Sequence, residues 1–555
     1  MRGLMMDVPL LTSSIITYAA RFNGDQEIVS RAVEGGIHRY TYRDAAARSA
    51  RLANALRALG VLDGMRIATI AWNTYRHFEL YYGVGGIGAV CHTINPRLHP
   101  GQIAYIVNHA DDRYVFVDLT FVPLLEALAP HLPRVRGYVV MTDEAHMPQT
   151  SLPNVFCYET LLAEQPATIE WPSFDENTAC GLCYTSGTTG DPKGVLYSHR
   201  AMVLHAMNVG VASATRRSDA SSCIMPIVPL FHVNGWGIPY AGPMMGSKLV
   251  FPGPAHDPAS IYELMEGERV ASAAGVPVIW LGLLAYLQQT GKELTALTSM
   301  SVGGSAAPAS LIEWFESRGI EVIHGWGMTE TSPVCTNGSL KPKHRDLPWP
   351  ERLELQRRAG RCAYGVEMKI VDEEGNTCPD DGSSQGELYV RGPWIANAYY
   401  NNAEATANQF TDDGWFRTGD ICSIDADGYL TIHDRAKDLI KSGGEWISSI
   451  DLENAAVAHP ELLEAAAIAI PHEKWAERPL LVAVRKPGSE VGRDDVLTFL
   501  EDKVAKWWLP DDVVFVDEMP HTATGKISKR TLRARYANGD FAVAAAGAAR
   551  AAGGT

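Results

Sequence analysis

The segment 184–195, which reads YTSGTTGDPKGV, constrains the fold of this chain more than any other stretch. Its hydroxyl residues, glycines and single lysine lie between two apolar runs, 180–184 and 195–197, that have the character of short strands. Ser198 then provides a good N-cap for a helix over 200–208. The sequence therefore predicts a glycine-rich loop between two strands, with a helix directly behind it.

The composition of this loop favours an anionic ligand. Glycines allow backbone N–H groups to approach an anion without an intervening Cβ, hydroxyl groups add donors, and Lys193 adds a positive charge. Such a loop suits a polyphosphate. It is not the Walker A loop, G-x-x-x-x-G-K-[ST], because Pro192 precedes Lys193 and Gly194 follows it. Taken alone, the loop is also compatible with an ordinary flexible turn.

Length and charge limit the classes of protein that this chain can represent. It has 555 residues, 46% of them apolar, and so is long enough for several domains with large cores. A formal net charge of −16 argues against a nucleic-acid partner, which recruits basic surfaces. No run of about 18 apolar residues occurs, so we expect no membrane-spanning helix.

The cysteines indicate the compartment. There are nine, an odd number, and they are scattered along the chain, which is typical of a reducing environment. The segment 1–11 contains Asp7 in a short apolar stretch and lacks the layout of a secretion signal. We therefore expect a cytoplasmic protein. Cys180 and Cys183 form a C-x-x-C pair without a second pair, in an expected buried strand, so we favour packing over a zinc or redox site.

Helices and strands alternate in the N-terminal part. Thr41 and Asp44 fit a capping box at the start of a helix. Strands are then expected at 65–71, 89–94 and 114–118, with helices between them at 75–82 and 102–109. Such alternation predicts layered α/β structure with helices packed on sheets.

Gly83, Gly85 and Gly88 match the dinucleotide-binding fingerprint G-x-G-x-x-G by letter. That fingerprint requires a strand followed by a helix, whereas here an expected helix precedes an expected strand. We interpret these glycines as positions of close packing between helix and sheet.

The pattern changes after about residue 360. Turn signals rich in Asp and Gly separate short strands and predict a compact β unit, and a charged stretch at 434–438 resembles a linker. A smaller α+β pattern continues to about residue 536. The remainder, 537–555, is mostly alanine and glycine and is expected to be disordered.

Three further segments carry candidate site residues. In 324–330, Trp326 offers a flat ring to a purine and Glu330 an oxygen ligand to Mg²⁺. Asp420 is suited to accept two vicinal hydroxyls, such as those of a ribose, and Lys526 lies beside a glycine in 522–527. Each segment alone is also compatible with an ordinary structural role. Trp326 could be a structural residue in a turn, Asp420 a turn aspartate and Lys526 a surface lysine.

Together and in this order, the four segments resemble the adenylate-forming superfamily of acyl-CoA synthetases, nonribosomal peptide adenylation domains and beetle luciferases, over about 28–536. Segments 4–11, 92–97 and 444–446 are similar to the bacterial medium-chain fatty acid–CoA and methylmercaptopropionate–CoA ligases. The resemblance implies an adenylation domain at 1–434, a hinge at 435–438, a mobile α+β domain at 439–536 and a tail at 537–555.

The resemblance also implies a reaction. A carboxylic acid and ATP would give acyl-AMP and pyrophosphate, and the thiol of coenzyme A would then displace AMP, with Mg²⁺ as the metal. Because the first step joins two anions, a positive charge between them should dominate catalysis. The resemblance assigns this charge to Lys526, with Thr329, Glu330 and His232 as the other catalytic residues. It assigns Thr185 and Glu330 to the metal and Lys437 to the hinge.

The residues that the resemblance implies for ATP and coenzyme A are spread over the whole chain. They are Thr185, Ser186, Gly187, Thr188, Thr189, Lys193, Gly303, Ser305, Ala306, Ala307, Pro308, His324, Gly325, Trp326, Gly327, Met328, Thr329, Asp420, Ile432, Arg435, Gly443, Gly444, Glu445, Trp446 and Lys526.

The acid would be bound by His232, Trp236, Val276, Gly303 and Gly327, with His232 between the acyl pocket and the thiol tunnel. His232 is compatible with a general base, since the ordinary pKa of histidine is about 6.5, with a gate, and with a packed core residue. The narrower resemblance implies a medium-chain fatty, short thioether or aryl-alkanoic acid.

Two features leave alternatives open. Glu445-Trp446 replaces the Glu-Asn of the wider superfamily, so Trp446 either narrows the tunnel mouth or packs on pantetheine. An adenylating enzyme that loads a carrier protein is an alternative function. A scaffold that lost the chemistry is another, although intact Lys193, Glu330, Asp420 and Lys526 argue against it. Relatives dimerise, so a homodimer is compatible with the resemblance.

Overall fold

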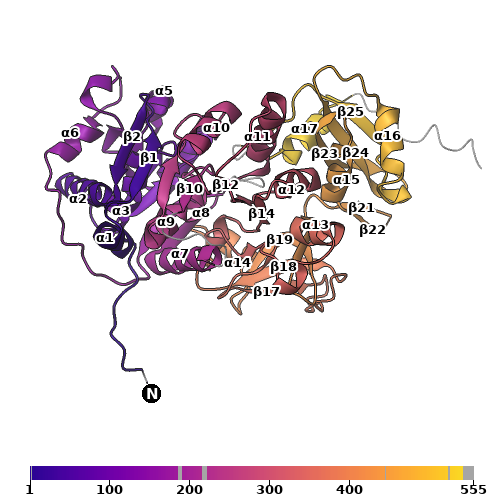
Figure 1. Cartoon of the computed structure of the whole chain (residues 1–555), viewed down its shortest axis with the longest axis horizontal. Coiled ribbons are helices and arrows are strands. Elements are labelled where there is room, and N and C mark those ends of the chain that lie inside the picture. Colours follow the sequence, from indigo (N-terminus) through magenta and orange to yellow (C-terminus); the bar gives the residue numbers. More distant parts are fainter. Residues whose placement is uncertain (2, 186–190, 215–221, 444, 523–525, 542–555) are drawn as a thin grey trace, which may run out of the picture.

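The computed structural model describes residues 1, 3–185, 191–214, 222–443, 445–522 and 526–541 (Figure 1). Two seven-stranded, mainly parallel sheets form the larger N-terminal part, and a two-stranded, a four-stranded and a five-stranded sheet follow toward the C-terminus. This is the mixed α/β architecture that the alternating sequence pattern predicts. Most of the predicted disordered tail, 542–555, lies outside the described residues.

The first sheet has the strand order β14-β13-β12-β10-β11-β1-β2. Neighbouring strands are parallel except for the edge hairpin β1–β2, which is antiparallel. Its strands are β1 (Glu27–Arg31), β2 (Ile37–Thr41), β10 (Cys223–Pro226), β11 (Lys248–Phe251), β12 (Ser272–Gly275), β13 (Ser299–Val302) and β14 (Glu321–His324).

The second sheet has the order β7-β6-β5-β3-β4-β8-β9 and is parallel except for its edge pair β8–β9. Its strands are β3 (Arg66–Ile70), β4 (Val90–Thr93), β5 (Asp112–Val117), β6 (Gly137–Val140), β7 (Val155–Cys157), β8 (Ala179–Tyr184) and β9 (Gly194–Ser198). The strands that the sequence predicts on either side of the glycine-rich loop are β8 and β9, so that prediction is confirmed.

Helices fill the space between the sheets and cover their outer faces. The central core joins both sheets through α1, α3, α7 and α9, while α10, α11 and α12 cover the first sheet and α2, α4, α5 and α6 the second. Their bounds are α1 (Ser13–Phe22), α2 (Tyr42–Ala58), α3 (Tyr75–Gly85), α4 (Pro100–Ala110), α5 (Val122–Leu128), α6 (Tyr158–Ala163), α7 (His199–Ala214), α9 (Ile238–Met245), α10 (Pro258–Gly267), α11 (Pro277–Thr290) and α12 (Ala309–Glu316).

Local signals in the sequence position several of these elements. The capping box of Thr41 and Asp44 is present at the start of α2, and the Ser198 hydroxyl accepts a hydrogen bond from Ala201 N at 3.1 Å at the start of α7. Gly83 packs against α2, because a Cβ there would lie 2.6 Å from a methyl carbon of Leu52. Gly83 is thus a packing position, but against helix α2 and not against a sheet, whereas Gly88 lies in a turn with φ +80°.

The C-terminal part contains the predicted β unit and α+β pattern. A four-stranded antiparallel sheet consists of β17 (Glu367–Val371), β18 (Gly386–Arg391), β19 (Phe416–Ile424) and β20 (Leu430–Arg435). A five-stranded sheet follows, with β21 (Ile440–Ser442), β22 (Glu445–Ile447), β23 (Leu462–His472), β24 (Ala476–Arg485) and β25 (Asp512–Phe515). The accompanying helices are α13 (Trp349–Arg357), α14 (Ala403–Gln409), α15 (Ser449–Val457), α16 (Arg493–Glu501) and α17 (Lys529–Ala537).

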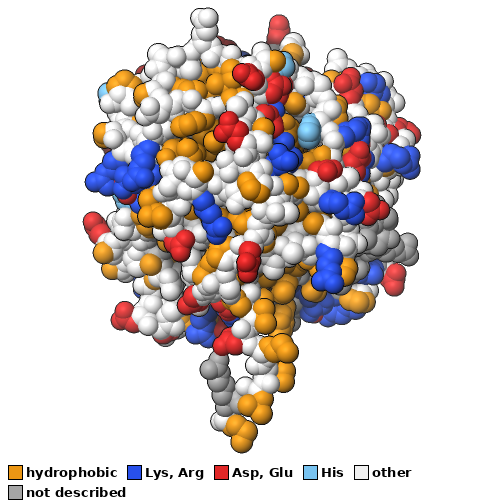
Figure 2. Space-filling view, turned by 90° about the vertical axis from the view of Figure 1, so that its left-hand side faces the viewer, with side chains coloured by type: hydrophobic (Ala, Val, Ile, Leu, Met, Phe, Trp, Pro, Cys, Tyr) orange, Lys and Arg blue, Asp and Glu red, His pale blue; other side chains and the backbone are white. Residues whose placement is uncertain are grey.

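The surface of the N-terminal part carries charges of both signs (Figure 2). The first residues of the chain project from this body, and Leu4, Met5 and Met6 are exposed. None of the described helices is both long enough and apolar enough to cross a membrane. All nine cysteines lie in the described residues and are free thiols.

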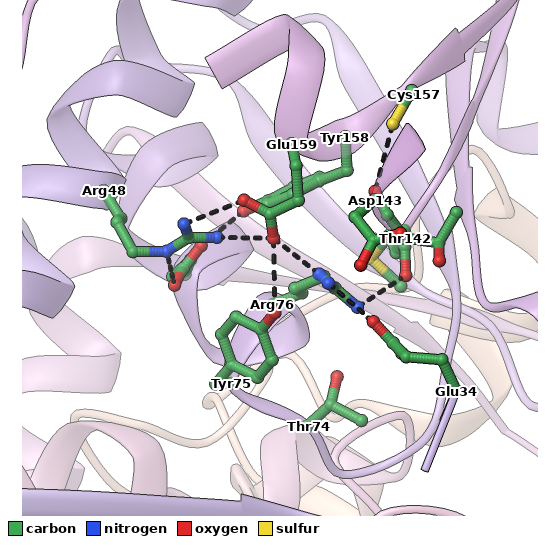
Figure 3. A network of polar contacts seen from close by, with 12 residues as sticks. Glu34, Arg48, Thr74, Tyr75, Arg76, Thr142, Asp143, Cys157, Tyr158 and Glu159 are labelled. Carbon is green, nitrogen blue, oxygen red and sulfur yellow. Dashed lines mark hydrogen bonds and ion pairs between the residues drawn. The ribbon is translucent and has the colours of Figure 1, made fainter. Parts of the chain in front are cut away.

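A network of charged side chains joins α2, α3 and α6 to Glu34, in the turn between β1 and β2 (Figure 3). Glu159 accepts hydrogen bonds from Arg48 through both of its oxygens, each at 2.9 Å, and from Arg76 Nε at 2.8 Å. Arg48 Nε also pairs with the buried Glu79 at 2.7 Å, and Arg76 with Glu34 at 2.8 Å. The negative charge of Glu159 therefore compensates two guanidinium groups that are largely removed from water.

We expect Glu159→Gln to destabilise the protein by about 3 kcal/mol, because both arginines would lose a charged partner while remaining in place. The midpoint of thermal unfolding, followed by circular dichroism, should fall. Glu164→Gln is the matched control, since Glu164 is exposed at the end of the same helix. Equal midpoints for the two variants would contradict a stabilising role for the network.

Candidate active site

One cavity of about 580 Å³ brings together 14 of the 30 candidate residues. Parallel strands of both sheets end at its wall, so the residues after β8, β13 and β14 face it, as expected for ligand sites in open α/β sheets. The predicted residues that line it are Thr185, Lys193, His232, Trp236, Gly303, Gly325, Trp326, Gly327, Met328, Thr329, Glu330, Arg435, Lys437 and Lys526.

Other predicted residues lie behind this wall or away from it. Val276 packs beside Gly304, and His324 is buried with Nδ1 at 2.9 Å from the Arg357 carbonyl oxygen, so its ring is used structurally. Ser305, Ala306, Ala307, Pro308, Asp420, Ile432, Gly443 and Trp446 are described residues outside the lining. Ser186, Gly187, Thr188, Thr189 and Gly444 lie outside the described residues, and Glu445 is placed by its backbone on β22.

The base of the glycine-rich loop is closed by its own ends. Thr185 N donates to the Lys193 carbonyl oxygen at 2.9 Å, and Lys193 N donates to Thr185 Oγ1 at 3.2 Å. The antiparallel pairing of Tyr184 with Gly194 continues this closure into β8 and β9. The loop therefore starts and ends at one fixed point of the cavity wall, with Lys193 at its exit.

Glu330 is a buried carboxylate in the same wall, and burial raises its pKa. The Tyr399 hydroxyl donates to Glu330 Oε1 at 2.6 Å, and the Lys193 ammonium lies 4.9 Å from the centre of the Tyr399 ring. Among the described residues no other side chain donates to this carboxylate. The sequence analysis missed Tyr399, because a tyrosine 69 residues away from its partner carries no local signal.

Asp420 is held from two sides. The indole N–H of Trp326 donates to Asp420 Oδ2 at 2.8 Å, and Arg435 Nε lies 2.6 Å from Oδ1. Asp420 is almost fully buried, and Trp326 is also buried with an edge at the cavity. The tryptophan thus orients the carboxylate, in addition to the purine contact that the sequence predicts for its ring.

His232 lies half-buried at the entrance to a left-handed turn. Burial lowers the pKa of His232 to about 4, and the positive charge of Lys526 acts in the same direction, so the ring is neutral at pH 7. Val233, Asn234 and Trp236 all have positive φ angles, which are unusual for residues with a Cβ. The turn directs the Trp236 ring over Gly303, where a Cβ would lie 3.1 Å from it.

Lys526 reaches the cavity from the C-terminal part of the chain. Its Cε would lie 3.7 Å from a Cβ at Gly304, so its stem passes over the segment after β13. Removal of water by the surrounding protein lowers the pKa of Lys526 to about 8, and the nearby charge of Arg435 adds to this, although the side chain remains accessible through the cavity. The ammonium is therefore mostly protonated at pH 7.

The predicted coenzyme A segment is directed elsewhere in this arrangement. Gly443 has φ +63°, donates its N–H to the Trp475 carbonyl oxygen at 2.8 Å, and leaves no room for a Cβ against the Trp475 ring. The hairpin β21–β22 approaches the β unit instead, with Lys441 Nζ 3.5 Å from Glu373. The segment between β25 and α17 thus presents Lys526 to the cavity, whereas Gly443 and Trp446 do not line it.

Comparison with known proteins gives matches over nearly the whole chain. A family model described as AMP-binding enzyme matches residues 17–400, and one described as AMP-binding enzyme C-terminal domain matches residues 451–526. The chain is 48% identical to a medium-chain-fatty-acid–CoA ligase of Ectopseudomonas oleovorans, over 97% of this chain and 98% of that protein. It is 48% identical to a 3-methylmercaptopropionyl-CoA ligase of Ruegeria pomeroyi, over 97% and 99%.

Solved structures agree with these matches. The fold is similar to that of the anthranilate CoA ligase AuaEII in complex with anthranoyl-AMP, with a TM-score of 0.83 and 26% identity, over 96% of this chain and 99% of that one. It is also similar to ATP-bound MatB from Rhodopseudomonas palustris, with a TM-score of 0.77 and 25% identity, over 94% and 99%.

Proposed function

This chain belongs to the AMP-binding enzyme family, and we propose that it is an ATP-dependent, AMP-forming ligase that joins a carboxylic acid to coenzyme A. The main support is the meeting of Lys526, from the C-terminal part, with Lys193, Glu330 and Arg435 across one cavity. These groups supply what an adenylation needs: cations for phosphates, a carboxylate for a metal and a mobile charge for the reacting centre.

In the first step a carboxylate oxygen attacks the α-phosphorus of ATP, the bond to the β-phosphate oxygen breaks, and pyrophosphate leaves. Both reactants are anions, so Lys526 lowers the barrier by lying between them and contacting both. Lys193 and the loop that begins at Thr185 bind the β- and γ-phosphates, and Thr329 contacts the α-phosphate.

Glu330 and Thr185 are the residues that would hold Mg²⁺. The described residues contain no cluster of three or more His, Cys, Asp or Glu side chains that could form a protein-only metal site. A single carboxylate and a hydroxyl fit Mg²⁺, which usually takes one or two protein ligands and completes its shell with phosphates and water. When bound, the ion would neutralise phosphate charge. Asp420 and Arg435 would hold the ribose hydroxyls.

In the second step the thiolate of coenzyme A attacks the acyl carbon and AMP leaves. We propose that the C-terminal domain, 439–536, turns about the hinge 435–438, so that Gly443, Gly444, Glu445 and Trp446 replace Lys526 at the cavity. The low pKa of His232, about 4, makes it a weak proton acceptor, so we favour a gate between acyl pocket and thiol tunnel over a general base.

The substrate would be a medium-chain fatty, short thioether or aryl-alkanoic acid. Apolar side chains line one part of the cavity, among them Val209, Trp236, Ile238, Val302 and Val334. The names of the 48% identical relatives support the first two acid classes. Free thiols throughout the chain support a cytoplasmic location, and a homodimer remains part of the proposal, to be checked by light scattering.

The proposal is tested by measuring pyrophosphate and AMP release with Mg-ATP across acetate to dodecanoate, 3-methylthiopropionate and phenylalkanoates. We expect coenzyme-A-dependent AMP release with an optimum at intermediate chain length. Formation of pyrophosphate without a coenzyme A thioester would point to another acceptor, such as a carrier protein. No turnover with any acid would contradict the proposal.

Lys526→Ala should separate the two half-reactions. Adenylation should slow by about 100-fold or more, because the charge between the two anions is lost, whereas thioester formation from supplied acyl-AMP should persist. Pyrophosphate release and thioester formation are the two measurements. Lys503→Ala, an exposed lysine of the same domain, is the control. Equal loss of both half-reactions in Lys526→Ala would exclude the assigned role.

Lys437→Pro should have the opposite effect. Proline fixes φ and so restricts the turn of the hinge, which should slow thioester formation more than adenylation. Lys437→Ala removes the same side chain without fixing the backbone and is the matched control. If both variants lose the same half-reaction to the same degree, the side chain and not the hinge is responsible.

A further inference from the structure

The segment 396–400, which we call the strap, crosses from the β unit to the wall of the cavity. It lies between β18 and α14, far in sequence from the glycine-rich loop and from Glu330. The strap nevertheless contacts both. Neither the family resemblance nor the sequence motifs assign it a role in the site.

The strap binds Glu330 through backbone and side chain. Ala396 N donates to the Glu330 carbonyl oxygen at 2.8 Å, and the Tyr399 hydroxyl donates to Glu330 Oε1 at 2.6 Å. The first contact fixes the main chain of the carboxylate residue, and the second fixes its side chain. Together they hold the carboxylate through Oε1, and among the described residues no side chain donates to Oε2.

The strap also binds the end of the glycine-rich loop. Tyr400 N donates to the Gly194 carbonyl oxygen at 2.8 Å, directly after Lys193. The Lys193 ammonium lies 4.9 Å from the centre of the Tyr399 ring, within the range of a cation–π contact. Two neighbouring tyrosines therefore hold the backbone and the charge at the exit of the loop.

The strap is itself firmly packed. Tyr399 is 6% exposed and belongs to the core between the two sheets. Tyr399 N donates to Thr406 Oγ1 at 3.0 Å, and its ring meets Phe410 edge to face with 5.6 Å between ring centres. A side chain held in one position can keep two groups that it contacts, here the Glu330 carboxylate and the Lys193 ammonium, at a fixed distance from each other.

From these contacts we infer that Tyr399 is a positioning residue that sets the Glu330 carboxylate and the Lys193 ammonium at the separation needed to bind Mg²⁺ and ATP phosphates together. This inference rests on the proposed function. Tyr399 also lines the cavity, but the role inferred here is exerted through its contacts with Glu330 and Lys193. Outer partners of this kind commonly change metal affinity or activity by about 10- to 100-fold when removed.

The first test is ATP binding measured by isothermal titration calorimetry as a function of MgCl₂ concentration, without acid, so that no turnover occurs. Tyr399→Phe removes the hydroxyl and keeps the ring beneath Lys193. Mg²⁺ should lower the Kd for ATP, and we compare the Mg²⁺ concentration at which half of this decrease is reached. In Tyr399→Phe we expect that concentration to be about 10- to 100-fold higher than in the parent enzyme. ATP binding in excess EDTA should be unchanged, since the ring contact with Lys193 is retained.

Tyr400→Phe is the matched control. The Tyr400 ring meets His109 edge to face with 5.8 Å between ring centres, and this contact and the backbone contact with Gly194 both survive the change. This variant should titrate with Mg²⁺ like the parent enzyme. Parent-like Mg²⁺ dependence in Tyr399→Phe, or the same shift in both variants, would overturn the inference.

The half-reactions distinguish positioning from loss of fold. In Tyr399→Phe, adenylation at limiting Mg²⁺ should slow, with the apparent KM for Mg-ATP raised more than kcat is lowered, and thioester formation from supplied acyl-AMP should match the parent. An equal loss of both half-reactions would contradict the inference. If the parent enzyme released no pyrophosphate with any acid, the proposed function would fail, while the calorimetric comparison would still decide the role of Tyr399 in binding Mg-ATP.

Discussion

The ion pair between Asp420 and Arg435 is the contact on which the arrangement of the site depends. Arg435 ends β20, the last strand of the β unit, and is the first residue of the proposed hinge. Its guanidinium lies 2.6 Å from an Asp420 oxygen, and Trp326 holds the other oxygen from the end of β14. One carboxylate thus links the first sheet, the β unit and the beginning of the C-terminal domain. Asp420 is almost fully buried while Arg435 is partly exposed, so removal of Arg435 would leave a buried carboxylate with the Trp326 indole as its remaining side-chain partner among the described residues.

Much of the fold and of the site follows from local sequence signals. The strands around the glycine-rich loop, the cap at Ser198 and the capping box of Thr41 are confirmed, because each depends on residues a few positions apart. Lys193, Glu330 and Lys526 line one cavity because motifs placed at the ends of parallel strands converge there. Their chemical roles remain predictions that the proposed variants address.

What the sequence could not supply depends on contacts between distant residues. Tyr399 is an ordinary tyrosine until the fold brings it to Glu330. The ordinary pKa of histidine, about 6.5, is compatible with a general base at His232. Burial in the folded chain lowers the pKa of His232 to about 4, and this burial depends on packing that the sequence does not reveal. The network around Glu159 is equally invisible, since its charges come from four separate segments that pair only after the helices have packed.

The contact of Trp236 with Gly303 also bears on how such a protein diverges. A Cβ at Gly303 would lie only 3.1 Å from the indole and 3.2 Å from the Gly325 carbonyl oxygen, so even one added methyl group would press on the Trp236 ring. Under the proposed assignment of this space to the acid, a single methyl group at Gly303 would change which acids fit, while Lys193 and Glu330 stay unchanged. Preference for an acid would then evolve separately from the handling of ATP.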